Sequence, residues 1–395
     1  MVTFLPFRGH RPFLGTGEDI GARISPPYDV IDSGYLKELQ AYRCNVTRLT
    51  LSPDDNGRYI GSRKELEKWI ADGSLVQDDD SFYLYEQEFT AGGKKMVRRG
   101  IVGILRTEPY ENGNIIPHEE TFSKVKEDRL NLLRDMETHL ESIFGIFGGF
   151  SAGLNIKIDA SSEKLYRYTD ECGVIHTYRK ISDKAVTDAM VSELSEQKML
   201  IADGHHRYET ALSYSIENPD DEKKGFVLAT LVASDDPGLV IWPTHRLLDS
   251  PLDEKDAVGK IKDSMTTADA DTPDDLCEEL PKWQMGLIFG SGKCMLARYD
   301  GPDDGLRSLD TYAAQELVIG KTYGYDAGTV KVSYDAEFGS VVKKMRNGTH
   351  DAAIVLNAPD LRTVWDLSAA GRRMPKKTTY FFPKIWSGFV FYKMG

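Results

Sequence analysis

The stretch Ile201–Leu212, IADGHHRYETAL, carries more information about this protein than any other segment of the chain. An apolar run, Met199–Ala202, ends at Asp203-Gly204, and a helical pattern follows directly. This order predicts a buried strand, a glycine turn and the start of a helix. The first turn of a helix has backbone N–H groups without intrahelical partners, and the helix dipole adds positive potential there. The stretch therefore predicts an anion-binding turn.

Three nitrogen-bearing side chains, His205, His206 and Arg207, follow the turn. An arginine can hydrogen-bond two phosphate oxygens at once, and Gly204 lets the backbone approach a ligand closely. Asp203 is a candidate metal ligand, or else it caps the helix. The alternative is an ordinary helix start with surface histidines. The two histidines are adjacent and lack the i, i+4 spacing of a two-histidine zinc helix.

The composition is that of an acidic globular protein. The 395 residues are 41% hydrophobic and 28% charged, with a net charge of −13. No segment approaches the roughly 20 apolar residues that span a bilayer, and the N-terminus lacks the apolar core of a signal peptide. The negative charge disfavours nucleic-acid binding because it repels a polyanion. The four cysteines form no paired motif, so we expect a cytoplasmic protein with reduced cysteines.

Helical and strand patterns alternate along the chain without a regular βαβ rhythm. Hairpin patterns recur, for example at 82–105 and 285–299. This mixture favours an α+β fold with mixed sheets over a doubly wound fold. We expect three parts: an N-terminal α/β segment at 1–78, a central phosphate-binding domain at 79–250, and a C-terminal α/β domain with a basic closing loop at 251–395.

A second candidate site follows Pro117. The segment His118-Glu119-Glu120-Thr121 stands at an expected helix start. A carboxylate such as that of Glu119 can take the proton of a substrate hydroxyl, with His118 sharing that proton. In the structural alternative, which the sequence alone favours, acidic residues in a first turn only stabilise the helix dipole.

Two more basic stretches are candidates for phosphate contacts. His245 and Arg246 are expected to end a buried strand, a common place for site residues in α/β sheets. Near the end of the chain, Lys376, Lys377 and Thr378 combine ammonium and hydroxyl groups that suit a polyphosphate. The alternatives are a strand end that meets solvent and an exposed loop. The glycine signatures of P-loop and Rossmann phosphate sites are both missing.

Five segments, in order, resemble the uncharacterised bacterial and archaeal family called domain of unknown function 1015. They are ISPPYDVI from Ile24, HEET from His118, ADGHHRYETAL from Ala202, PTHRLL from Pro243 and MPKKTTYFFPK from Met374. The resemblance spans nearly the whole chain. It implies a free-standing cytoplasmic protein and supplies no established reaction.

Within that likeness, IADGHHR resembles the nucleotide-phosphate motif of the ParB/sulfiredoxin superfamily. Its members include DNA-partitioning proteins that use CTP, sulfiredoxin, which uses ATP, and free-serine kinases. The resemblance implies a ParB/sulfiredoxin-like central domain, a phosphate cradle at Asp203, Gly204, His205, His206 and Arg207, and ATP, ADP or CTP with Mg²⁺ as cofactors. It also implies that Glu119 is the candidate base.

Three functions are open at this point. The first, toward which the sequence leans, is a nucleotide-dependent phosphotransferase acting on a small hydroxylated metabolite, with an amino acid such as serine as one candidate. Its catalytic candidates are Glu119, His118 and His206, and its metal ligand is Asp203. The second is a metal-dependent phosphoesterase in which Asp203 and histidines hold Mn²⁺ or Zn²⁺. The third is a non-catalytic nucleotide or metabolite sensor. The oligomeric state is left open.

Overall fold

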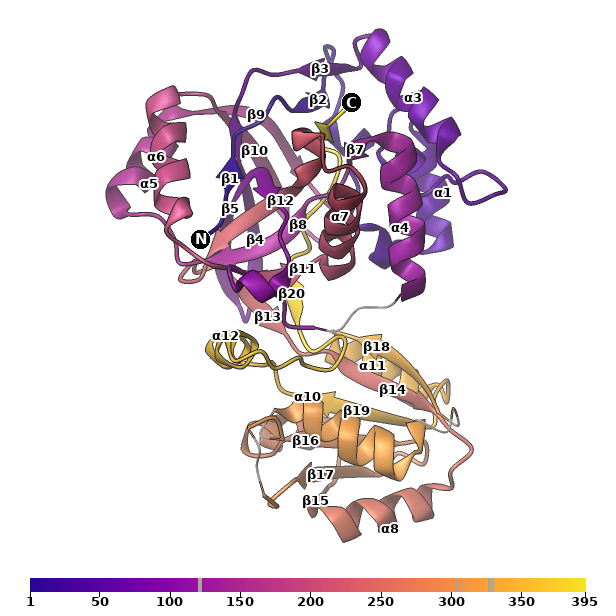
Figure 1. Cartoon of the computed structure of the whole chain (residues 1–395). Coiled ribbons are helices and arrows are strands. Elements are labelled where there is room, and N and C mark those ends of the chain that lie inside the picture. The colour runs from indigo at the N-terminus through magenta and orange to yellow at the C-terminus, as the bar shows by residue number, and fades with distance from the viewer. Residues whose placement is uncertain (120–122, 303–304, 308, 326–327, 329) are drawn as a thin grey trace. The chain divides into compact units, whose positions relative to one another are not determined.

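The computed structural model describes residues 1–119, 123–302, 305–307, 309–325, 328 and 330–395 (Figure 1). The chain forms two compact units. Unit 1 comprises Met1–Pro117, Thr121–Val240 and Pro383–Gly395, and unit 2 comprises His118–Glu120 and Ile241–Phe382.

These two units divide the chain differently from the three expected parts. Residues 1–78 belong to unit 1 together with most of the expected central domain, and residues 383–395 return to unit 1 from the expected C-terminal domain. The division at residues 78 and 250 therefore stays a prediction.

A nine-stranded mixed sheet forms the centre of unit 1, in the order β6-β11-β8-β12-β5-β4-β10-β9, with β1 pairing to β5. The pairs β6–β11 and β8–β12 are parallel, and the other pairs are antiparallel. Its strands are β1 (Phe4–Leu5), β4 (Phe82–Ala91), β5 (Lys94–Arg106), β6 (Ile115–Ile116), β8 (Ile143–Phe147), β9 (Ser162–Thr169), β10 (Ile175–Ile181), β11 (Met199–Asp203) and β12 (Phe226–Ala233).

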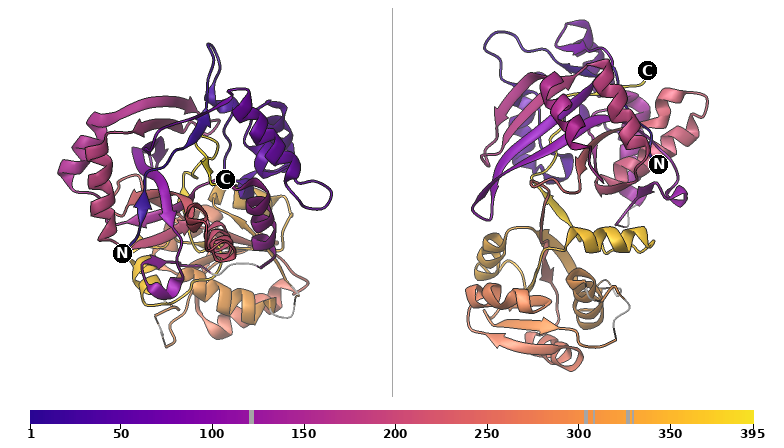
Figure 2. Two further views of the ribbon diagram at one scale, coloured as in Figure 1. Left: turned by 45° about the horizontal axis from the view of Figure 1, so that its top comes forward. Right: turned by 90° about the vertical axis from the view of Figure 1, so that its left-hand side faces the viewer.

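Helices cover this sheet on both sides (Figures 1 and 2). In both figures α5 and α6 lie at one side of the unit, and α4, α7 and the N-terminal helices lie at the other. The helices are α1 (Ser33–Ala41), α2 (Thr47–Thr50), α3 (Ile60–Ala71), α4 (Ser123–Met136), α5 (Ala152–Ser161), α6 (Lys184–Ser195) and α7 (His205–Glu217). Two short ladders complete the unit: β2 (His10–Pro12) with β3 (Leu75–Gln77), and β7 (Thr138–His139) with β21 (Tyr392–Lys393).

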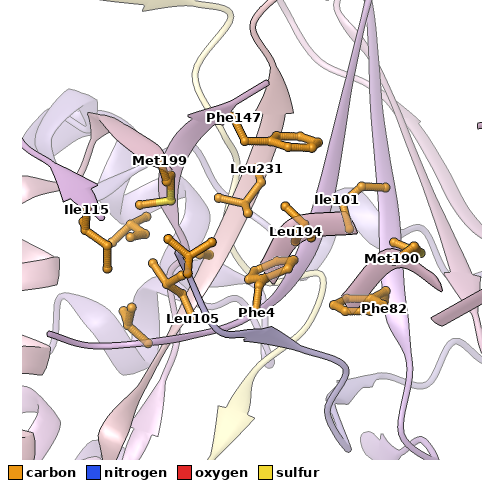
Figure 3. Close-up of a cluster of buried hydrophobic side chains, with 14 of the residues drawn as sticks. Phe4, Phe82, Ile101, Leu105, Ile115, Phe147, Met190, Leu194, Met199 and Leu231 are labelled. Atoms are coloured by element: carbon orange, nitrogen blue, oxygen red, sulfur yellow. The ribbon is translucent and has the colours of Figure 1, made fainter. Parts of the chain in front are cut away.

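One large apolar cluster of unit 1 joins residues of the sheet with residues of α5, α6 and α7 (Figure 3). Strand β12 reads FVLATLVA and is buried along nearly its whole length, as expected for a central strand covered on both faces. Gly103 in β5 is required by this packing, because a Cβ there would lie 2.7 Å from both Phe4 and Phe82. A larger residue at that position would have to push two buried rings apart.

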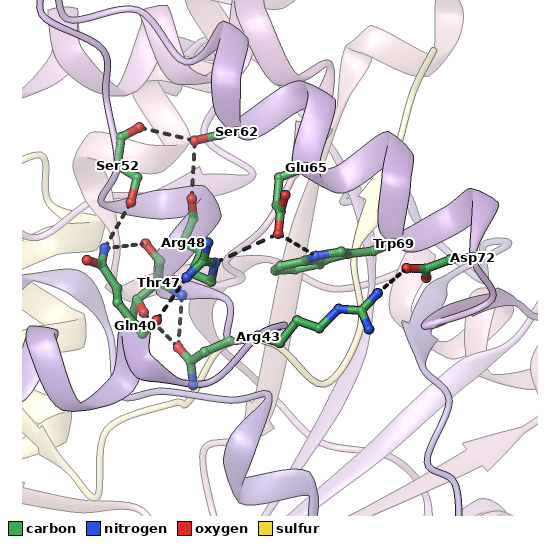
Figure 4. Close-up of polar contacts among 10 residues, drawn as sticks. Gln40, Arg43, Thr47, Arg48, Ser52, Ser62, Glu65, Trp69 and Asp72 are labelled. Atoms are coloured by element: carbon green, nitrogen blue, oxygen red, sulfur yellow. Dashed lines mark hydrogen bonds and ion pairs between the residues drawn. The ribbon is translucent and has the colours of Figure 1, made fainter.

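The N-terminal helices are joined by polar contacts as well as by apolar packing (Figure 4). Gln40 Nε2 donates to Ser52 Oγ at 2.9 Å, and the Trp69 indole donates to Glu65 Oε1 at 3.1 Å. The first contact joins α1 to the segment after α2, and the second lies within α3, which packs against α4.

Unit 2 contains an antiparallel six-stranded sheet in the order β15-β17-β16-β19-β14-β18. Its strands are β14 (His245–Asp249), β15 (Thr266–Ala270), β16 (Met285–Phe289), β17 (Cys294–Arg298), β18 (Lys331–Asp335) and β19 (Ala352–Leu356), and β13 (Val240–Trp242) pairs separately with β20 (Tyr380–Phe382). Its helices are α8 (Glu254–Ser264), α9 (Pro273–Glu279), α10 (Asp310–Ala313) continuing into a π-helix (Ala314–Thr322), α11 (Phe338–Arg346) and α12 (Leu361–Ala369).

The α+β fold with mixed sheets is confirmed, and so are the hairpins expected at 82–105 and 285–299. One local expectation is wrong. His245 and Arg246 begin strand β14 rather than end a strand, because Pro243 interrupts the apolar run and Leu247-Leu248 continue it into the core. In the described part of the chain, no helix is long and apolar enough to cross a membrane.

Candidate functional site

The predicted turn between a buried strand and a helix is present in unit 1. Strand β11 ends at Asp203, Gly204 has φ +88°, and α7 begins at His205. A Cβ on Gly204 would lie 3.1 Å from Nε of Arg207, so both the backbone conformation and the close approach of Arg207 require glycine. The predicted strand–turn–helix unit is therefore confirmed.

Asp203 is held between two cations. Its Oδ2 accepts a hydrogen bond from Arg207 Nη2 at 3.0 Å, and its Oδ1 accepts one from Lys384 Nζ at 2.9 Å. Arg207 Nη1 also donates to the backbone oxygen of Ser142 in the loop before β8. The capping alternative for Asp203 does not hold, since Gly204 is the residue that caps α7. The carboxylate instead fixes the direction of two basic side chains.

This arrangement bears on the predicted magnesium site. Asp203 would be a first ligand for Mg²⁺, which prefers carboxylate oxygen. Here each carboxylate oxygen already faces a positively charged donor, at 2.9 Å and 3.0 Å. A divalent cation would have to displace Lys384 or Arg207 from Asp203. The residues present therefore do not fit a metal at this carboxylate, and the predicted role of Asp203 as a metal ligand stays a prediction.

Arg207 also borders a small cavity of about 40 Å³, whose lining combines leucines with charged side chains. The cavity lining includes Arg129, Glu141 and Thr210. Arg129 and Glu141 are nearly fully buried, and Tyr28 N donates weakly to Glu141 Oε1 at 3.4 Å. Burial, with the charge of Glu141 acting in the same direction, raises the pKa of Tyr28 to about 12. The turn is thus backed by a buried cluster of charged side chains.

The two histidines of the motif differ in exposure. His205 is 6% exposed, whereas His206 is only half-buried. Adjacent residues on a helix project about 100° apart, so the two rings face different surroundings. The catalytic role predicted for His206 and the phosphate role predicted for both histidines stay predictions.

Glu119 is the centre of a second cluster, in unit 2. Its Oε1 accepts the backbone N–H groups of Thr378 at 3.0 Å and Thr379 at 3.4 Å. His118 Nε2 lies 3.4 Å from the same oxygen and 2.8 Å from Thr379 Oγ1. Met374 N donates to the backbone oxygen of His118 at 2.9 Å. The segment His118-Glu119 therefore runs alongside residues 374–379, which form the closing loop. Glu120 and Thr121 of this motif lie outside the described residues.

Arg246 also contacts the closing loop through hydrogen bonds. This guanidinium is fully buried, and it donates to the backbone oxygens of Thr244 and Lys377, the latter at 3.2 Å. Burial lowers the pKa of Arg246 to about 10, opposed by the nearby charges of Tyr334 and Glu119. Arg246 thus remains charged at neutral pH and fixes the loop through backbone carbonyls.

The remaining predicted residues, one in β14 and three in the closing loop, differ in their surroundings. His245 is buried, accepts the backbone N–H of Leu356 at Nδ1, and has a pKa lowered to about 4 by burial. Lys376 is half-buried, and Lys377 is exposed in a left-handed conformation with φ +57°. Thr378 is fully buried and donates to Pro375 O at 2.6 Å. The tertiary structure therefore joins His118, Glu119 and Arg246 to the loop, while phosphate contacts by these residues stay predictions.

Three residues at the turn were missed by the sequence analysis. Lys384 lies 181 positions after Asp203, and Arg98 and Gln87 come from two strands with ordinary polar–apolar alternation. Lys384 is the last residue of the segment MPKKTTYFFPK, which did not indicate a partner for it. Separately, within the described residues, no group of three or more His, Cys, Asp or Glu side chains is placed to hold a metal ion.

Several solved structures are similar to this chain at low identity. A free serine kinase variant in complex with ADP has a TM-score of 0.40 and 12% identity, covering 68% of this chain and 83% of its own. A conserved hypothetical protein from Pyrococcus furiosus has a TM-score of 0.38 and 14% identity, covering 70% and 92%. SbnI with a C-terminal truncation, from Staphylococcus aureus, has a TM-score of 0.39 and 10% identity, covering 72% and 85%.

Because each of these TM-scores is below 0.5, what those proteins bind is not carried over to this chain. No curated protein matches the chain. The family model described as protein of unknown function (DUF1015) matches residues 4–312, and the chain therefore belongs to that family.

Proposed function

We propose that this protein binds a nucleoside polyphosphate and transfers a phosphoryl group to the hydroxyl of a small metabolite. The observation that carries the proposal is the turn at Gly204, where Asp203 directs Arg207 and Lys384 at the N-terminus of the 13-residue helix α7. Basic side chains and a helix N-terminus together favour phosphate groups. The resemblance of IADGHHR to a nucleotide-phosphate motif supports the same assignment.

The proposed reaction is a displacement at the terminal phosphorus of the nucleotide. The acceptor oxygen forms a bond to the terminal phosphorus, the bond from that phosphorus to the bridging oxygen breaks, and the shortened nucleotide leaves with the bonding electrons. Glu119 is the proposed base that takes the acceptor proton. Arg207 and Lys384 offset charge on the phosphoryl oxygens, and stabilisation of this kind is usually the largest catalytic contribution. Mg²⁺ is expected to accompany the nucleotide phosphates, and no step is assigned to it.

Isothermal titration calorimetry tests nucleotide binding directly. The protein should bind ATP, ADP or CTP in the presence of Mg²⁺, and Arg207→Ala should weaken binding by about 1.5–3 kcal/mol, the usual value for a hydrogen bond to a charged group. Lys157→Gln, which changes an exposed cation on α5 of the same unit, is the matched control and should bind as the wild type does. A wild-type protein with no measurable affinity for any of these nucleotides would refute the proposal.

A second candidate function is supported by a specific contact. Glu119 Oε1 already accepts two backbone N–H groups of the closing loop, which is a structural use of a carboxylate. A non-catalytic nucleotide sensor would need Glu119 only for that contact. Glu119→Gln retains one amide oxygen as an acceptor. If the protein is a sensor, this variant should bind nucleotide normally. If it is a kinase, the variant should also bind nucleotide, but its turnover with any accepted substrate should fall by 10²–10⁴-fold.

A further inference from the structure

Lys384 is placed by a pair of buried residues on the central sheet. Gln87 in β4 and Arg98 in β5 are direct cross-strand partners. Arg98 Nη2 donates to Gln87 Oε1 and to the backbone oxygen of Pro383, and Gln87 Nε2 donates to the backbone oxygen of Lys384 at 2.8 Å. Two successive carbonyls of the returning chain are therefore fixed by two adjacent strands.

The burial of the charged Arg98 guanidinium has a cost in free energy. It is 1% exposed, its guanidinium lies 5.0 Å from the ring centroid of Phe144, and it forms no ion pair with any described residue. Its Nε and Nη1 atoms are buried without a hydrogen-bond partner. Taking an unpaired charge out of water costs several kcal/mol. Burial lowers the pKa of Arg98 to about 10, so the group is still cationic at neutral pH.

Charged groups of both signs surround the turn, and Glu141 and Asp29 act on Arg207 besides Asp203. Arg207 and Lys384 both contact Asp203, and the carboxylates of Asp236 and Asp203 act on Arg98 from a longer distance. Asp236 is itself bound to the backbone N–H groups of Arg99 and Gly238. Arg207 and Lys384 both contact Asp203 directly before the start of α7, where backbone N–H groups and the helix dipole favour an anion.

We infer that Lys384 binds the phosphate groups of the nucleotide, and that Arg98 and Gln87 are positioning residues for it. Asp203 then orients Lys384 and Arg207 toward those phosphates. This inference rests on the proposed function, because it assigns new residues to the same phosphate site. It predicts that affinity depends on the charge of residue 384 only for ligands that carry phosphate.

The first experiment measures three probes by calorimetry: ATP, inorganic pyrophosphate and adenosine. Lys384→Gln should weaken ATP and pyrophosphate binding by about tenfold to a hundredfold, as expected for the loss of a charged hydrogen bond. Lys384→Arg should retain most of the affinity, and any adenosine affinity should be unchanged in both variants. Lys157→Gln removes an exposed cation from the same unit and is the matched control.

The salt dependence gives a readout that a structural role for Lys384 would not change. The wild-type affinity for pyrophosphate should fall as KCl rises from 0.05 M to 0.5 M, because salt screens exposed charge interactions. The fall should be smaller for Lys384→Gln and unchanged for Lys157→Gln. Thermal melting of each variant confirms that it is folded before it is titrated.

The second experiment tests the positioning role of Gln87. Gln87→Leu keeps the volume of the side chain but removes its donor to Lys384 O and its acceptor for Arg98. It should weaken pyrophosphate binding, and combination with Lys384→Gln should cost less than the sum of the two single losses. Additive losses would mean that Gln87 affects binding independently of Lys384 and would overturn its positioning role.

The two proposals fail in distinguishable ways. If the wild-type protein binds neither ATP nor pyrophosphate, the proposed function is wrong and the role of Lys384 is wrong with it. If the wild type binds both and Lys384→Gln binds them equally well, the proposed function stands and the assignment of Lys384 is overturned.

Discussion

The ammonium group of Lys384 lies 2.9 Å from Oδ1 of Asp203, although 181 positions separate the two residues. Asp203 ends a central strand, and Lys384 belongs to the segment that returns to unit 1 near the end of the chain. The ion pair therefore links the glycine turn to the segment 383–395 of the same unit. Because both side chains are mostly withdrawn from water, at 27% and 11% exposed, the contact has a more definite geometry than a surface ion pair.

Gly204→Ala tests the left-handed turn. Alanine at φ +88° is strained, and its Cβ would lie 3.1 Å from the guanidinium of Arg207. We expect a loss of about 1–3 kcal/mol in the free energy of unfolding, measured by urea denaturation. Gly61→Ala in α3 is the control, since nothing lies within 4 Å of its Cβ and alanine favours a helix. Equal stabilities of the Gly204→Ala variant and the wild type would contradict the strain argument.

Leu231→Ala tests the core of unit 1. Leu231 is fully buried in β12, and its side chain contacts the position where a Cβ of Gly145 would lie, at 2.7 Å. We expect a loss of about 2–5 kcal/mol from the lost apolar burial and the cavity left behind. Ile156, which is 71% exposed on α5, provides the control substitution Ile156→Ala, expected to change stability by no more than about 0.5 kcal/mol.

Acid should destabilise unit 1 through His139. Burial lowers the pKa of this histidine from 6.5 to about 4, while a hydrogen bond to the backbone of Phe226 opposes the shift. Between these two values the unfolded chain binds a proton that the folded chain excludes. The resulting stability is present above pH 6.5 and is lost as the pH falls to about 4, with a total of about 3 kcal/mol.

Urea denaturation at pH 7 and pH 4.5 measures this dependence. His139→Gln removes the titrating group and should reduce the difference in unfolding free energy between the two pH values. If the variant and the wild type lose the same stability on acidification, other groups are responsible.

Arg246 should control the order of the closing loop in unit 2. Arg246→Met leaves the backbone oxygens of Thr244 and Lys377 without this donor. A buried carbonyl without a partner costs about 1–3 kcal/mol, so the loop should open more often. Limited trypsin digestion should then cleave after the exposed Lys377 faster than in the wild type.

The control for this digestion is Arg362→Met, because Arg362 is 90% exposed on α12 and is held by one i, i+4 ion pair. Its loop cleavage should match that of the wild type. Equal cleavage rates in the Arg246→Met variant would show that other contacts, such as those of Glu119 with Thr378, hold the loop without it.

Local patterns predicted much of the fold. The apolar run before Asp203 gave β11, Gly204 gave the turn, and the pattern after it gave α7. These features depend on residues that are near each other in sequence, so propensity and periodicity report them directly. The mixed sheets followed from hairpin spacing in the same way. The start of β14 was misplaced by a few residues because strand ends depend on pairing with β18 and β19, which lie about a hundred residues away.

The candidate site also combines features of short motifs with contacts between distant segments. The sequence by itself determined the glycine turn and the basic stretch near residue 376, because each is a short motif whose chemistry follows from its own residues. Only the tertiary structure decided that Lys384 contacts Asp203, that Thr378 donates to Glu119, and that Arg98 is buried beside Gln87 and Pro383. Such contacts follow from how distant segments pack into one core, and the free energy of that packing has no signature in any single stretch of the chain.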